Sequence, residues 1–106
     1  MIQKRKINEI VNKIARVIHP RKIILFGSYA VEKQNEESDL DLLVIVESAD
    51  LPQHKRARAI RKHLWGLTDI PKDIVVYTEK EIQEWRKVKS SFISSILEYG
   101  KVLYEN

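Results

Sequence analysis

Two aspartates with one residue between them are the feature of this sequence that most directly suggests chemistry. Asp39 and Asp41 flank the start of an apolar run that extends from Leu40 to Val46. On a strand, side chains two positions apart point to the same face, so the two carboxylates would lie side by side. Aspartate is a poor strand former, and two neighbouring carboxylates repel each other unless a cation lies between them. Mg²⁺ fits this role because it is held by one or two carboxylates together with substrate phosphates, so the pair predicts a magnesium site.

A glycine and a serine mark the end of an earlier apolar run. Gly27 and Ser28 follow the Ile-Ile-Leu-Phe segment that ends at Phe26, where a strand would turn into a short helix. Glycine lets the backbone approach a ligand closely, and the start of a helix offers free amides to a phosphate. The serine hydroxyl adds a further donor. A phosphate-binding turn beside a magnesium site indicates an enzyme that acts on a nucleoside triphosphate.

The apolar pattern predicts the elements that must hold these residues. Apolar residues at helical spacing between Ile7 and Ile18 predict a helix that stops before Pro20. Short strands are expected at 22–26, 40–46 and 73–77, and the second has apolar residues on both faces, as a central strand requires. Between the last two strands, a helix rich in basic residues is expected to end near Gly66.

The C-terminal part is expected to add two helices and an edge strand. Thr78 and Glu81 form a capping-box pattern at the start of the first helix. The second helix should span about 90–99 and end at Gly100, which can adopt a left-handed turn, and residues 102–104 fit an edge strand. The predicted fold class is α/β, in the order α-β-α-β-α-β-α-α, with a small three-stranded sheet flanked by helices and an optional extra strand.

Length and composition limit the kind of protein that this chain can be. Its 106 residues suit a single domain, residues 1–106, with one core. The absence of cysteine excludes a disulfide framework and a thiolate metal site. No apolar run approaches the roughly 20 residues of a membrane span. We therefore expect a cytoplasmic protein that does not insert into a membrane.

The net charge of +4 is concentrated in one segment. Residues 53–63 contain no acidic side chain and five basic ones, namely Lys55, Arg56, Arg58, Arg61 and Lys62. Such a stripe attracts phosphates or an acidic partner. An apolar stripe at helical spacing beside it favours the simpler interpretation of a solvated helix face. Trp65 and Trp85 lie near apolar helix faces and are interpreted as core or interface anchors.

Gly27-Ser28, a gap of ten residues and then Asp39-x-Asp41 together resemble the signature of the nucleotidyltransferase superfamily that includes DNA polymerase β. The chain length and the Ser-Asp-Leu-Asp-Leu-Leu-Val run are most similar to the minimal nucleotidyltransferases, which are typically the antitoxin partners of HEPN-domain toxins in prokaryotes. The resemblance implies a third carboxylate on the strand after the crossover helix, and Asp73 is the matching position. It also implies ATP as substrate, bound at Gly27 and Ser28, and two Mg²⁺ ions held by Asp39, Asp41 and Asp73.

This set of residues predicts the directions of the strands. Gly27 lies at the exit of the first strand, whereas Asp39 and Asp73 lie at the entrances of the second and third. They can surround one triphosphate only if the first strand runs antiparallel to the second. The third strand must then run parallel to the second through a right-handed crossover. The sheet should therefore be mixed, with Asp73 close to the Asp39–Asp41 pair.

The resemblance implies transfer of AMP from ATP to a hydroxyl, such as a tyrosine of a HEPN-domain toxin, with this chain acting as the antitoxin. Two other functions are compatible with the sequence. One is a non-catalytic antitoxin that neutralises its partner by binding. The other is a nucleotidyltransferase that places its basic segment on nucleic acid, which is the less favoured partner. The sequence also leaves a homo-oligomer open.

The sequence departs from the family pattern just after the glycine-serine turn. Close relatives often carry Arg-Gly where Val31 and Glu32 stand here. The change removes an arginine that could hold a phosphate, and Glu32 would repel a phosphate if it faced the site. Lys33 supplies a positive charge nearby, but without the two-pronged geometry of arginine.

Overall fold

The computed structural model describes residues 4–33, 38–67 and 70–106. The first half of the chain forms α1 (Lys4–Ile18), β1 (Lys22–Phe26), the 3₁₀ turn η1 (Gly27–Tyr29) and β2 (Leu40–Val46). The second half forms α2 (Gln53–Leu64), β3 (Lys72–Thr78), α3 (Glu79–Trp85), α4 (Phe92–Tyr99) and β4 (Lys101–Glu105). This order agrees with the sequence prediction, and the edge strand expected at 102–104 forms as β4.

The described strands make one mixed sheet in the order β3-β2-β1-β4. β1 runs antiparallel to both β2 and β4. β2 and β3 run parallel and are joined through α2. The directions predicted for the first three strands are therefore confirmed.

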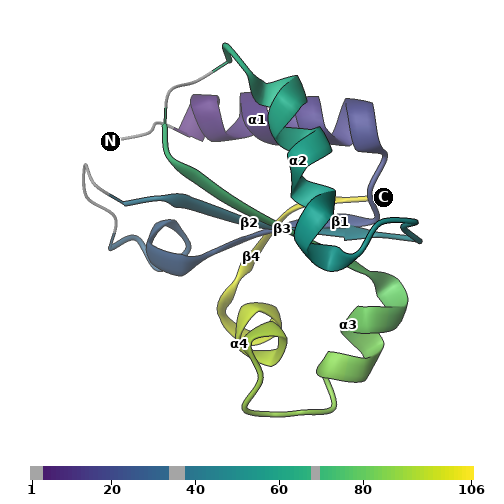
Figure 1. Cartoon of the computed structure of the whole chain (residues 1–106). Helices are drawn as coiled ribbons and strands as arrows, with labels where there is room; N and C mark the ends of the chain where they lie inside the picture. Colours follow the sequence, from purple (N-terminus) through teal and green to yellow (C-terminus); the bar gives the residue numbers. More distant parts are fainter. Residues whose placement is uncertain (1–3, 34–37, 68–69) are drawn as a thin grey trace.

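Helices cover the sheet on both faces: α1 and α2 lie over one face, and α3 and α4 lie over the other (Figure 1). Because side chains alternate along a strand, β2 contributes to both layers. Leu40, Leu42 and Val44 pack in the core under α1 and α2, whereas Leu43 and Ile45 pack in the core under α3 and α4. All five are at most 5% exposed, so β2 is a central strand, as predicted.

The start of α3 confirms the predicted capping box. The Thr78 hydroxyl accepts a hydrogen bond from the backbone amide of Glu81 at 3.2 Å. The Glu81 carboxylate in turn accepts one from the backbone amide of Thr78 at 2.8 Å. These bonds satisfy amides that the helix itself leaves without partners. The chain therefore turns sharply from β3 into α3.

The prediction of a left-handed glycine after α4 is wrong. Gly100 has φ −75° and ψ 165°, which is extended backbone. A glycine is nevertheless required, because a Cβ at this position would lie 2.6 Å from both the Ile24 side chain and the Ile96 carbonyl oxygen. The glycine lets α4 end in close contact with the sheet. α4 also begins at Phe92 rather than at residue 90, because the Ser91 hydroxyl caps it by accepting from the amide of Ser94.

The basic segment on α2 is not one solvated stripe. The side chain of Arg56 is only 10% exposed. Its guanidinium donates to the Glu81 carboxylate at 2.6 and 3.2 Å and to the carbonyl oxygens of Leu51 (2.7 Å) and Val76 (3.3 Å). Arg56 thus joins α2 to β3 and α3, and the solvated-face interpretation is wrong for it. That interpretation holds for the exposed members of the set, Lys55, Arg58, Arg61 and Lys62.

Neither tryptophan lies in the core. Trp65, just after α2, is 91% exposed, and Trp85, at the end of α3, is also exposed. The interpretation of these residues as core anchors is therefore wrong. No helix within the described ranges is long and apolar enough to span a bilayer.

Candidate active site

The strand registers bring two of the predicted aspartates together. In the parallel pair of β2 and β3, Asp41 is the register partner of Asp73. In the antiparallel pair of β1 and β2, Asp41 is the register partner of Phe26, the residue before Gly27. The exit of β1 and the entrances of β2 and β3 therefore lie at the same edge of the sheet. The predicted proximity of Asp73 is confirmed for Asp41, the second aspartate of the pair.

Gly27 lies directly against Asp41. Its φ is +74°, in the region that side chains rarely adopt. A Cβ built on Gly27 would lie 2.1 Å from Oδ2 of Asp41, so no larger residue fits without displacing that carboxylate. The backbone of the turn and the carboxylate thus form one open surface, since Gly27 is itself exposed.

Ser28 lies inside the 3₁₀ turn η1 that follows β1. The turn is closed by two backbone hydrogen bonds: the amide of Ala30 donates to the Gly27 carbonyl at 3.1 Å, and the amide of Lys33 donates to the Ser28 carbonyl at 2.9 Å. Tyr29 and Ala30 are buried and anchor the turn to the core. A short 3₁₀ helix therefore forms where the sequence predicted a short helix, and it places Ser28 directly after Gly27, the residue that lies against Asp41.

The three aspartates repel one another. Burial, together with the negative charges of Asp73 and Asp39, raises the pKa of Asp41 from 3.8 to about 6. Within the described residues, no lysine or arginine forms an ion pair with any of the three. The nearest cation in sequence, Lys72, donates instead to the carbonyl of Ile70 at 3.0 Å. The edge of the sheet thus carries concentrated negative charge that the described part of the chain does not neutralise.

This donor set suits a hard cation that completes its shell with substrate. Among the described residues, no three histidine, cysteine or acidic side chains already converge as metal ligands. Mg²⁺ does not need such a cage, because it is usually held by one or two carboxylates, with waters and phosphate oxygens as its other ligands. Carboxylate oxygens at an open edge, with their charge uncompensated, match that preference. Asp39, Asp41 and Asp73 are the residues that could hold it.

The two positions that depart from the family pattern lie beside the turn. Glu32 has φ +57°, a left-handed conformation that glycine adopts without strain. Its carboxylate lies 3.7 Å from the Lys101 ammonium on β4, and β4 and β2 flank β1 on opposite sides. The carboxylate of Glu32 is therefore turned away from the aspartates and does not repel a ligand there. Val31 is exposed and contributes no charge.

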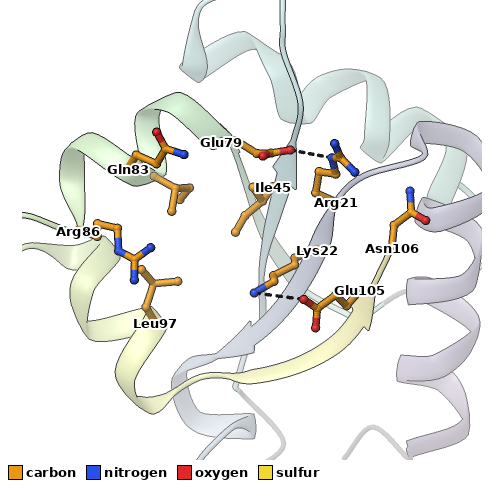
Figure 2. A pocket seen from close by; sticks show the side chains of 10 residues that line it. Arg21, Lys22, Ile45, Glu79, Gln83, Arg86, Leu97, Glu105 and Asn106 are labelled. Atoms are coloured by element: carbon orange, nitrogen blue, oxygen red, sulfur yellow. Dashed lines mark hydrogen bonds and ion pairs between the residues drawn. The ribbon is translucent and has the colours of Figure 1, made fainter.

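A cavity of about 500 Å³ lies at the other end of the sheet (Figure 2). Its walls carry two ion pairs, Arg21 with Glu79 at 2.7 Å and Lys22 with Glu105 at 3.5 Å. None of the residues that line it belongs to the aspartate edge. Sequence reasoning did not predict this cavity, because its lining comes from elements far apart in the chain. It is separate from the carboxylate chemistry.

Comparison with known proteins agrees with the geometry. The family described as "Polymerase beta, Nucleotidyltransferase" matches residues 5–106. Two proteins of Methanocaldococcus jannaschii, each named "Putative protein adenylyltransferase", are similar to the chain. One is 32% identical over 109 residues, covering 98% of this chain and all of the relative. The other is 31% identical over 96 residues, covering 89% and 91%.

Two solved structures share the fold. A protein from Sulfolobus solfataricus, described as a "putative nucleotidyltransferase", superposes with a TM-score of 0.66 at 17% identity, over 96% of this chain and 79% of the other. A chain from a toxin–antitoxin structure with AMP-PNP superposes with a TM-score of 0.63 at 24% identity, over 93% and 73%. With the family match across residues 5–106 and the register that sets Gly27, Asp41 and Asp73 at one edge, the chain belongs to the polymerase β nucleotidyltransferase family.

Proposed function

We propose that this nucleotidyltransferase transfers AMP from ATP to a tyrosine hydroxyl of a HEPN-domain toxin, and so acts as its antitoxin. The observation that carries the proposal is the pairing of Asp41 with Asp73 beside the open backbone of Gly27. It supports a site in which the carboxylates act together with the accessible backbone of this turn. Relatives named as protein adenylyltransferases support a protein as acceptor. A structural neighbour from a toxin–antitoxin complex with AMP-PNP supports a toxin as that protein.

In the proposed reaction the chain binds and orients the nucleotide. The exposed backbone at Gly27 and the hydroxyl of Ser28 hold the phosphates, and Asp39, Asp41 and Asp73 hold Mg²⁺. When bound, Mg²⁺ neutralises phosphate charge, favours ionisation of the attacking hydroxyl and stabilises the leaving group. The tyrosine oxygen forms a bond to the α-phosphorus, the bond from the α-phosphorus to the bridging oxygen breaks, and pyrophosphate leaves. The hydroxyl proton passes to solvent.

A test compares the wild type with the double variant Asp39→Asn/Asp41→Asn. Each is co-expressed with the HEPN-domain protein, and the partner is examined by intact-mass and peptide mass spectrometry. We expect an AMP adduct on a tyrosine only with the wild type. Because the substitutions remove repulsion and no packing, the variant should stay folded by circular dichroism. Equal modification by both proteins would exclude the aspartate site.

The non-catalytic antitoxin makes a different prediction. It requires that the wild type binds ATP with Mg²⁺ and forms a complex with the toxin, while the toxin carries no AMP. The nucleic-acid function has lost part of its support, because Arg56 is committed to Glu81 and leaves four exposed cations on α2. It predicts binding that weakens steeply between roughly 50 and 200 mM salt. A filter-binding titration with single-stranded and duplex nucleic acid distinguishes it from the proposal.

A further inference from the structure

The aspartates emerge on one particular face of the sheet. Directly opposed residues in an antiparallel pair point to the same face, so the side chains of Phe26 and Asp41 share one. Phe26 packs against the core cluster that contains Ile93 and Ile96 of α4. The face that carries Asp41 is therefore the one covered by α3 and α4. The first turn of α4 lies next to Phe26 on this face.

An aromatic ring of α4 extends toward this edge. The rings of Phe26 and Phe92 meet edge to face, with centroids 5.4 Å apart and planes inclined at 82°. Phe92 is the first residue of α4 and is 51% exposed, although the next residue, Ile93, is buried. Phe26 thus fixes the orientation of Phe92 and leaves part of its surface open to solvent.

The distances suit a ligand that spans from the turn to this ring. Cβ atoms of directly opposed residues in an antiparallel pair lie about 5 Å apart, so Phe26 is next to Asp41. The ring of Phe92 lies beyond that of Phe26, with the two ring centroids 5.4 Å apart. A sugar of similar size separates the α-phosphate of a nucleotide from its base. A nucleotide with its phosphates at Gly27 would therefore bring its base near Phe92.

We infer that Phe92, held in place by Phe26, is the platform on which the base of the bound nucleotide stacks. This inference rests on the proposed function, because it requires the phosphates at Gly27 and Ser28. Stacking on an aromatic ring favours binding and tolerates different bases, since every base has a π-face. Phe92 therefore holds ATP and GTP alike, and selection between them falls to other contacts.

Another exposed aromatic residue provides a matched control. Trp65 precedes the segment that leads into β3, so it lies toward the same edge of the sheet. It belongs to the opposite layer, because it lines a surface depression with Leu64 and Lys72, and Leu64 packs in the core under α1 and α2. A base that follows the Asp41 face reaches Phe92 and not Trp65. The cavity of Figure 2 is excluded for a different reason: it lies under α3 and α4, but at the far end of the sheet, where Ile45 pairs with Lys22.

The test is calorimetric titration of four proteins with Mg²⁺–ATP and with Mg²⁺–tripolyphosphate, which lacks the sugar and base. The proteins are the wild type, Phe92→Leu, Phe92→Trp and Trp65→Leu. We expect Phe92→Leu to bind ATP about tenfold more weakly, within the range that stacking contributes, and to bind tripolyphosphate as the wild type does. Phe92→Trp should restore ATP binding, and Trp65→Leu should leave both affinities unchanged.

The tripolyphosphate titration separates the possible failures. Wild-type affinity for ATP in Phe92→Leu would overturn the platform and leave the phosphate site intact. Weaker ATP binding in Trp65→Leu would overturn it in favour of the opposite face. If Phe92→Leu lost affinity for ATP and for tripolyphosphate equally, the platform would be overturned as well. The ring would then act by stabilising the turn at Gly27 and not by stacking on the base. A wild type that binds neither ligand would overturn the proposed function itself, and the platform with it.

Discussion

At the scale of single residues, Gly27 is required for two separate reasons. Its φ of +74° strains any residue with a Cβ, and that Cβ would also meet the Asp41 carboxylate. Gly66 has a similar φ of +81°, but a Cβ there would have no heavy atom within 4 Å. The two glycines share the strain and differ only in the contact. They therefore allow the effect of the backbone to be separated from the effect on the site.

We predict that Gly27→Ala and Gly66→Ala both lower the free energy of unfolding by about 1 kcal/mol from left-handed strain. Only Gly27→Ala should also lose affinity for Mg²⁺–ATP, because its methyl group displaces Asp41. Urea denaturation measures the first effect and titration calorimetry the second. Gly27→Val should bind ATP still more weakly, since a branched side chain resists these backbone angles more strongly. Wild-type ATP affinity in a folded Gly27→Ala protein would show that the phosphates bind elsewhere.

The pKa of Asp41 predicts how stability changes with pH in the absence of divalent cations. In the folded protein this pKa is raised from 3.8 to about 6, so the unfolded chain loses the proton at lower pH than the folded protein. The protonated Asp41 carboxyl therefore makes its full contribution to the free energy of unfolding below pH 3.8, and this contribution is lost as the pH rises to about 6. Asp41→Asn should not show this loss and should melt at a higher temperature than the wild type above pH 6.

Thermal melts in EDTA, repeated with excess Mg²⁺, measure this effect. Mg²⁺ should raise the melting temperature of the wild type above pH 6, because a ligand that binds only the folded state stabilises it. It should have much less effect on Asp41→Asn. Parallel pH dependence of the two proteins in EDTA would mean that the carboxylates do not interact as the structure indicates.

At the scale of elements, Arg56 connects three of them. Its side chain lies on α2 and is only 10% exposed. The guanidinium donates to the Glu81 carboxylate, which caps α3, and to the Val76 carbonyl of β3. The hydrogen bond from Arg56 is the main cause that lowers the pKa of Glu81 below 4.5, so this pair stabilises the fold above that pH and less as the pH falls. These contacts hold the start of α2, the helix that connects the parallel strands β2 and β3, against the end of the sheet opposite to the aspartates.

We predict that Arg56→Met lowers the free energy of unfolding by about 3 kcal/mol, because it leaves the Glu81 carboxylate and two carbonyl groups without their donor. Arg58→Met, on the exposed side of the same helix, should change it by less than about 0.5 kcal/mol. Urea denaturation at neutral pH compares the two. Equal stability of both variants would show that the Arg56 ion pair does not hold α2 against α3.

Several elements could be predicted from sequence because local signals and chemistry agreed. β2 has apolar residues on both faces, and the need to gather Gly27, Asp39 and Asp73 predicted the strand directions. Arg56 could not be separated from the basic segment, because its partner lies 25 residues away and the contact exists only in the folded chain. A glycine at position 100 is consistent with a left-handed turn and also with a close approach of the backbone to the sheet. Only the structure distinguishes these two reasons for the glycine. The exposure of Phe92 likewise depends on where α4 meets β1.

At the scale of the whole molecule, the mixed sheet is what makes the chemistry available. The labelled strands β1 and β3 flank β2 in the sheet (Figure 1). The registers show that the antiparallel β1 brings the glycine turn, and the parallel β3 brings Asp73, to one edge. A fully parallel sheet would have placed Gly27 and the aspartates at opposite ends. We therefore expect this edge to transfer a nucleotidyl group, with Asp73 taking part although it is 32 positions beyond Asp41 in the sequence.

The most direct measurement follows radioactive phosphate from ATP labelled at either the α or the γ position onto a purified HEPN-domain protein, the proposed acceptor, in the presence of Mg²⁺. We predict that the α label appears on the acceptor protein and the γ label does not, because pyrophosphate leaves. We also predict a loss of transfer of at least about 100-fold for Asp73→Asn, if the third carboxylate stabilises the transition state by several kcal/mol. Incorporation of the γ label, or undiminished transfer by a folded Asp73→Asn protein, would contradict the proposed nucleotidyl transfer at this edge.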